Sequence, residues 1–179
     1  MIALMALLLT ASTSSDPLPL NAKVVAFARS NLGLKVGDGE CTALASSALR
    51  AAGARDRPPW GDEITRMADL RPGDLLFFEN VVLLQRRLRN DGAIIRQTVK
   101  TPRHAAIVDR VDPIGKDLQI TVLHQNSGFK TTDEEAKKLV QTWTFRLGEK
   151  KAGTIRAYRP IAMTTNPSPL SDRTDPSLP

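Results

Sequence analysis

Cysteine is almost absent from this chain, whose 179 residues include a single one, Cys41. A lone cysteine excludes an internal disulfide framework, because each disulfide needs two thiols. Aromatic residues are also scarce, at 4% of the sequence, and histidine occurs only twice, as His104 and His124. These scarcities leave one thiol and two imidazoles from which a cysteine nucleophile and its base can be built.

Acidic residues are outnumbered by basic ones, which gives a net charge of +6 and a pI near 9.8. This balance favours an acidic partner. The densest basic stretch is the Gln-Arg-Arg-Leu-Arg of residues 85–89, followed by Arg96, Lys100 and Arg103. Proteins that stack single-stranded nucleic acid interleave aromatic residues with such charges, and this stretch contains none. We therefore predict no nucleic-acid partner and interpret the stretch as a solvated surface, with a small nucleic-acid-binding protein as an alternative resting on charge alone.

The first residues are apolar from Ile2 to Leu9 and small from Thr10 to Ser15. This pattern predicts a secretory signal peptide over residues 1–15, and therefore a secreted or periplasmic protein. The alternative is a buried first helix, because no Lys or Arg precedes the apolar run as it would in a signal peptide. No apolar run approaches the ~18 residues of a transmembrane anchor, so we expect none. Residues 20–161 are predicted to form one domain, and the Pro- and Ser-rich residues 162–179 a disordered tail.

Helical periodicity comes first along the chain, over residues 21–33 and again over 41–52, where Gly53 follows as a C-cap. A Pro-Gly-Asp turn then leads into the buried run Leu75–Glu79. Later β-prone runs are separated by Asp91-Gly92 and by the turn at residues 113–117, both of which indicate hairpins. The order predicts an α+β fold, with N-terminal helices packed on an antiparallel sheet of about five to seven strands.

Cys41 follows a Gly-Asp-Gly-Glu turn and stands at the predicted start of the second helix. Backbone N–H groups and the helix dipole at such a position stabilise a thiolate and lower the pKa of the thiol. The same N–H groups can hold an oxyanion. The alternative is a core thiol that fills space on a helix rich in small residues.

Both histidines fall on one predicted hairpin. His104 opens a strand, His124 lies near the end of the next, and a turn around Pro113–Lys116 brings them roughly opposite each other. Asn126 is two residues beyond His124 and is expected on the same strand face. One imidazole can then act as a base while His124 or Asn126 orients it. The alternative is that each histidine is a buried side chain with its hydrogen bonds satisfied.

Four segments in order resemble the NlpC/P60 and CHAP group of papain-like cysteine peptidases and amidases, over roughly residues 23–160. The segments are Glu40–Leu44 with Ala51–Gly53, Leu70–Phe78, His104–Val108 and Val122–Asn126. The resemblance implies that Cys41 is the nucleophile and His104 the general base. It places His124 at the position of the family's third polar residue and Asn126 at that of an asparagine common in CHAP members.

The same resemblance implies cleavage of amide bonds in peptidoglycan peptides, without a metal or cofactor. The chain also departs from the family pattern. Glu-Cys-Thr-Ala replaces the usual Asp-Cys-Ser-Gly, and the tyrosine often found before the cysteine is missing, since the only tyrosine is Tyr158. The segment 79–103 is longer than expected, and we hypothesise that it lies over the cleft and meets anionic wall polymer.

The sequence therefore predicts a cysteine-dependent amide hydrolase with peptidoglycan or another peptide as its substrate. The altered residues around Cys41 support a second hypothesis, a catalytically inactive papain-fold domain that binds cell wall or protein. The sequence leaves the oligomeric state open.

Overall fold

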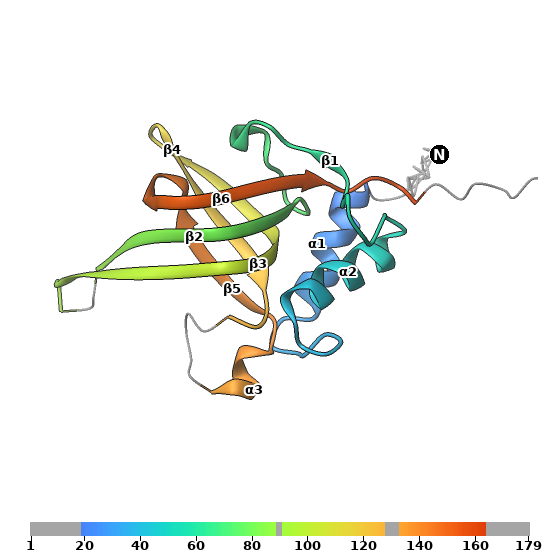
Figure 1. Ribbon diagram of the computed structural model, residues 1–179, viewed down its shortest axis with the longest axis horizontal. Coiled ribbons are helices and arrows are strands. Elements are labelled where there is room, and N and C mark those ends of the chain that lie inside the picture. The colour runs from blue at the N-terminus through green and yellow to red at the C-terminus, as the bar shows by residue number, and fades with distance from the viewer. Residues whose placement is uncertain (1–18, 89–90, 128–132, 164–179) are drawn as a thin grey trace, which may run out of the picture.

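The computed structural model describes residues 19–88, 91–127 and 133–163. Two helices come first, α1 (Leu20–Ser30) and α2 (Cys41–Ala52). The described strands form one six-stranded antiparallel sheet in the order β1-β6-β2-β3-β4-β5. Their bounds are β1 (Asp62–Glu63), β2 (Leu75–Leu88), β3 (Ile94–Ile114), β4 (Asp117–His124), β5 (Gln141–Arg146) and β6 (Lys150–Arg159). Figure 1 shows both helices packed at one end of the curved sheet. The predicted α+β architecture is confirmed.

Three short helices complete the fold: η1 (Met67–Asp69), α3 (Glu134–Lys137) and η2 (Leu147–Glu149). Helix α2 has the predicted bounds, and Gly53 caps it with a left-handed φ of 75°. Helix α1 ends at Ser30, three residues earlier than predicted. The side chain of Asn31 donates to the carbonyl of Phe27, and Gly33 turns away to donate its N–H to Val140.

The central strands are longer than predicted, because segments expected to be separate are continuous. Leu75–Glu79 and the run after it form the single strand β2, and the two runs on either side of Pro102 form the single strand β3. A bulge bends β2 at Asn80, whose φ is +50°. Opposite it, a Cβ on Gly153 would lie 2.3 Å from the Asn80 carbonyl oxygen, so only glycine fits there.

Two hydrophobic clusters lie on opposite faces of the central strands. One joins the helices to the sheet, where Ala45, Ala48 and Ala52 of α2 let the helix approach Ala105 and Ile107 of β3. The other lies on the far face and includes Leu76, Phe78, Ala106, Val108, Val122, Trp143 and Phe145. Strands buried on both faces read as continuous apolar runs, which accounts for the Leu-Leu-Phe-Phe sequence at the start of β2.

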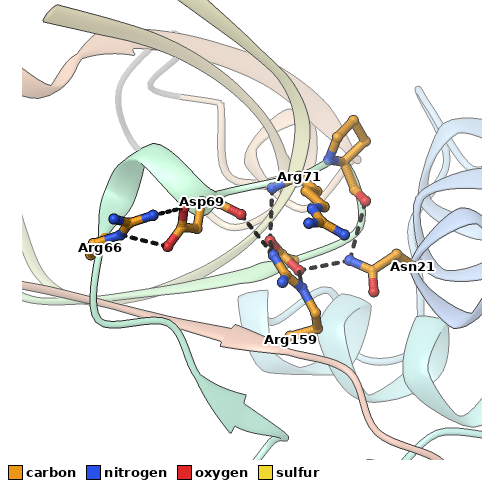
Figure 2. Close-up of polar contacts among 7 residues, drawn as sticks. Asn21, Arg66, Asp69, Arg71 and Arg159 are labelled. Atoms are coloured by element: carbon orange, nitrogen blue, oxygen red, sulfur yellow. Dashed lines mark hydrogen bonds and ion pairs between the residues drawn. The ribbon is translucent and has the colours of Figure 1, made fainter.

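The Pro-Gly-Asp turn before β2 fixes helix α1 against the sheet. Asp74 is fully buried and accepts hydrogen bonds from the Asn21 amide at 2.6 Å, the Arg71 N–H at 2.7 Å and the Arg159 guanidinium at 3.0 Å. Figure 2 shows these contacts converging from α1, the turn and β6. A Cβ on Gly73 would lie 2.0 Å from the Asn21 carbonyl oxygen, so the turn requires glycine. The motif therefore has a structural role, because it joins α1 and β6 to the start of β2.

The predicted signal peptide, residues 1–15, and most of the predicted tail lie outside the described residues. The described chain continues to Met163, whose N–H donates to the Gly53 carbonyl. Ala162, expected in the tail, forms a β-bridge with Ala54. Within the described ranges, no helix has the length and apolar character needed to span a bilayer.

Candidate active site

The turn before α2 places Cys41 next to the sheet. The Asp38 carboxylate accepts the Glu40 N–H at 2.9 Å, and Gly39 has a φ of +91°. A Cβ on Gly39 would lie 2.8 Å from the Lys138 side chain. The Glu40 side chain makes no capping hydrogen bond to α2. It therefore does not occupy the backbone N–H groups of the first turn, which begins at Cys41.

Cys41 and His104 line the same cleft, which has a volume of about 620 Å³. Helix α2 contributes Cys41 and Thr42, and strand β3 contributes Arg103, His104 and Ala105. The Cys41 thiol is partly exposed and lies at the backbone N–H groups of Ala105 and Thr42. The thiol therefore sits beside the residue that follows His104, and it is open to the cleft.

The two imidazoles contact each other, as expected from the predicted hairpin. Nε2 of His104 lies 3.0 Å from Nδ1 of His124, and the ring centroids are 5.1 Å apart. The rings are only 6% and 0% exposed. If His124 accepts the shared hydrogen bond, His104 carries its proton on Nε2 and has an unprotonated Nδ1. That is the tautomer in which His104 can accept a proton.

The environment keeps the thiol and the His104 imidazole in their neutral forms. Burial raises the pKa of the Cys41 thiol, and the Glu40 carboxylate raises it further, against the lowering effect of the Ala105 and Thr42 N–H groups. Burial also lowers the pKa of His104 to about 4. The expectation of a lowered thiol pKa at the helix terminus is therefore wrong, because desolvation outweighs the N–H donors. Cys41 and His104 are therefore both neutral in the resting protein.

Asn126 does not hold the imidazole. Strand β4 ends at His124, so the face alternation predicted for Asn126 is lost, and its φ of +55° lies in the left-handed region. Its amide instead donates to the Glu40 carboxylate at 2.6 Å, and its N–H donates to Lys137. Asn126 thus contacts the carboxylate of the residue before Cys41, and of Asn126 and His124 it is His124 that contacts His104.

Gln125 is a site residue that the sequence analysis missed. It is fully buried, and its amide nitrogen donates to the carbonyls of Val36 at 2.9 Å and Glu40 at 2.7 Å. Its amide oxygen accepts the Val36 N–H at 3.3 Å. The residue after His124 therefore holds both ends of the turn that carries Cys41. In the sequence this contact is marked only by a glutamine that directly follows the predicted strand.

Comparison with protein families matches residues 20–167 to the AIM3/BBC1 cysteine proteinase-fold domain. The chain belongs to this family. The predicted papain-like cysteine proteinase fold is thereby confirmed, while the family is AIM3/BBC1 rather than specifically NlpC/P60 or CHAP. Searches of curated proteins and of solved structures returned no match.

Four aromatic residues, Trp60, Phe77, Phe78 and Tyr158, line the cleft of this AIM3/BBC1 domain. Trp60 stacks on Phe77 with ring centroids 5.1 Å apart, and Phe77 meets Tyr158 edge-to-face at 5.7 Å. All three line the cleft with Cys41. Tyr158 lies in β6, far along the chain from Cys41, and also lines the cleft. Nothing in the sequence indicated this position. The aromatic residues give the cleft a rigid apolar wall.

Charged residues of both signs stand at the rim of the cleft in this family member: Glu79, Arg103 and Arg156. The pKa of Arg156 is raised by hydrogen bonding to Tyr158 and by the nearby Glu79 and Glu63 carboxylates. Among the described residues of the segment 79–103, only Glu79 and Arg103 line the cleft. The other described residues of this segment extend away from the helices (Figure 1), so the hypothesis that this segment covers the cleft is wrong.

The described part of this domain contains no group of three or more His, Cys, Asp or Glu side chains placed to hold a metal ion.

Proposed function

We propose that this AIM3/BBC1 domain is a cysteine-dependent hydrolase of amide bonds. Cys41 is the nucleophile, His104 the general base, and His124 the residue that orients His104. The observation that carries the proposal is the 3.0 Å contact between the two imidazoles, with His104 lining the same cleft as the thiol. A base held by a second acceptor beside a nucleophile is the arrangement common to catalytic triads.

The neutral resting pair supports a general-base first step. As the Cys41 sulfur attacks the carbonyl carbon, the thiol proton moves to Nδ1 of His104, and the resulting imidazolium donates its Nε2–H to His124. The N–H groups at the sulfur and along the first turn of α2 are the donors available to the oxyanion. His104 then returns the proton to the leaving amine, and water hydrolyses the thioester that remains on Cys41.

The cleft wall favours a peptide with an apolar side chain beside the scissile bond. Trp60, Phe77 and Tyr158 offer stacking faces to such a side chain. Peptidoglycan peptides as the substrate, a secreted or periplasmic location and a closer kinship to NlpC/P60 or CHAP enzymes stay predictions from the sequence. They rest on the motif resemblance and on the apolar first residues.

A second candidate function is a non-catalytic papain-fold module that binds peptide in the same cleft. Two observations favour it: burial raises the pKa of the thiol, and the Glu40 carboxylate next to Cys41 raises it further. Both make it harder for the thiol to lose its proton, and attack by the sulfur requires that loss.

Hydrolysis of a mixed peptide library, followed by mass spectrometry of new amino termini, separates the two candidates. We expect cleavage beside apolar residues, abolished by Cys41→Ala and reduced by about 10²–10⁴-fold in His104→Gln, the usual contribution of a general base. Thermal melts of both variants serve as the folding control. Cleavage that persists in Cys41→Ala would refute the assignment, and peptide binding without cleavage by the wild-type protein would establish the module.

A further inference from the structure

The β2–β3 hairpin extends beyond the rest of the sheet as a two-stranded arm, which we define as residues 82–88 and 94–100. Strand β6 pairs with β2 only as far as Leu83, and β4 pairs with β3 only from Ile107 onward. Beyond these points β2 and β3 pair with each other alone, out to Leu88 opposite Ile94. Figure 1 shows the arm projecting away from α1 and α2. Nothing in the proposed chemistry uses it.

The far end of the arm exposes large aliphatic side chains. Leu88 is 73% exposed, Ile94 67% and Ile95 44%. Leu88 and Ile94 are directly opposite each other across the two strands, so their side chains share one face. These three residues form a small exposed apolar surface at the far end of the arm, which we call the apolar point.

Behind the apolar point, the same face carries cations without described counter-charges. Arg86 is directly opposite Arg96, and Lys100 follows on the same strand. Like charges opposite each other destabilise a strand pair. Among the residues that the structure describes, no carboxylate forms an ion pair with any of these three. An anionic partner would compensate for this repulsion.

The charge of the whole chain is concentrated in this segment. Residues 80–103 contain six basic residues and one acidic residue, a net charge of +5 out of +6 for the chain. The same residues contain no Phe, Trp or Tyr. Base-stacking recognition of single-stranded nucleic acid is therefore disfavoured, whereas aliphatic and basic residues together suit a lipid interface.

We propose that the arm docks on an anionic phospholipid bilayer. Leu88, Ile94 and Ile95 enter the boundary between headgroups and acyl chains, and Arg86, Arg96 and Lys100 contact the lipid phosphates. The apolar pair and the arginine pair are two positions apart along each strand, a spacing of about 7 Å at ~3.3 Å per residue. This matches the depth of about 5–10 Å that interfacial segments reach. The docking is independent of the chemistry proposed for Cys41.

Flotation of the full chain with vesicles tests the proposal. The vesicles contain phosphatidylcholine alone or with 30 mol% phosphatidylserine, at low and at high salt. The charge variant is Arg86→Glu with Arg96→Glu, and its matched control is Lys35→Glu with Lys116→Glu, two exposed cations outside the arm. The apolar variant is Leu88→Ser with Ile94→Ser, and its control is Leu34→Ser with Ile114→Ser, which are 56% and 38% exposed.

We expect binding only to vesicles with phosphatidylserine, weakened by salt, and reduced about tenfold or more in each arm variant but not in either control. Three results would overturn the proposal: no binding to either vesicle, equal loss in arm and control variants, or loss in the charge variant without loss in the apolar variant. The last result would assign the arm to an acidic protein, because no apolar insertion would then be required. Unchanged melting temperatures verify that the variants are folded.

Discussion

His104 has the environment that most constrains the chemistry of the cleft. Its ring is 6% exposed, and burial lowers its pKa to about 4, so it is neutral at physiological pH. The neutral form is the one able to accept the proton of a neutral thiol. The sequence located both histidines on one hairpin, but it carried no information on burial, and for that reason the pKa of Cys41 was predicted in the wrong direction.

Burial of neutral His104 predicts a loss of stability in acid. An unfolded histidine has a pKa near 6.5, so between that value and about 4 the unfolded protein binds a proton that the folded protein does not. His104 therefore contributes its full stabilisation to the folded protein above pH 6.5. As the pH falls toward 4, the free energy of unfolding decreases by about 3 kcal/mol through this group. Urea unfolding of wild-type protein and His104→Gln at pH 7.5 and pH 4 measures the difference. Parallel losses in the two proteins would contradict the prediction.

The turn that precedes Cys41 is hydrogen-bonded to Gln125, the residue directly after β4. This contact between elements links the start of α2 to the strand that carries His124. The sequence predicted α2 with its correct bounds because its apolar periodicity and Gly53 are local signals. Gln125 bridges Val36 and Glu40 across 89 and 85 positions of sequence. Long-range hydrogen bonds of a single polar side chain leave no periodic pattern, so sequence reasoning assigned the supporting role to Asn126 instead.

Replacing Gln125 tests whether this contact positions the nucleophile. Gln125→Leu keeps the volume but leaves the Val36 and Glu40 backbone groups without the amide, and we expect a loss of about 2 kcal/mol in stability. We also expect alkylation of Cys41 to slow by about tenfold, because the first turn of α2 is no longer fixed against the sheet. Gln85→Leu is the control, since Gln85 is 3% exposed and donates to the Thr144 carbonyl away from the cleft. Equal slowing in both variants would show that only general stability matters.

At the scale of the whole molecule, the folded body and the arm are distinct in charge and in packing. The two hydrophobic clusters lie in the helices and the shared parts of the sheet and extend into the arm only at Leu83 and Val99, whereas the arm carries most of the net charge. The sequence predicted the hairpin at Asp91-Gly92 and its basic character from local signals. It did not predict that β2 and β3 run on through the sheet, because a buried strand and the exposed strand that continues it have different patterning.

Shortening the arm tests this division. Replacing residues 86–96 by Asn-Gly joins Gln85 to Gln97, which are paired in the register, and lowers the net charge from +6 to +3 by removing four Arg and one Asp. We expect the free energy of unfolding to change by less than about 1 kcal/mol, because the described side chains that are removed are exposed. Chemical unfolding measures the change, and unaltered Cys41 labelling serves as the control for the site. A loss of several kcal/mol would show that the arm belongs to the core.

The most direct test of the account is the rate of Cys41 alkylation by iodoacetamide in the folded protein between pH 3.5 and pH 9, with His104→Gln measured beside it. We predict that His104 takes up the thiol proton as the sulfur reacts, so that labelling of the wild-type protein at pH 7 is about 10²-fold faster than that of the variant. This difference is expected to disappear as the pH falls toward 4, where His104 becomes protonated. Labelling that is equally slow in both proteins until they unfold would contradict the account and leave Cys41 as a core thiol.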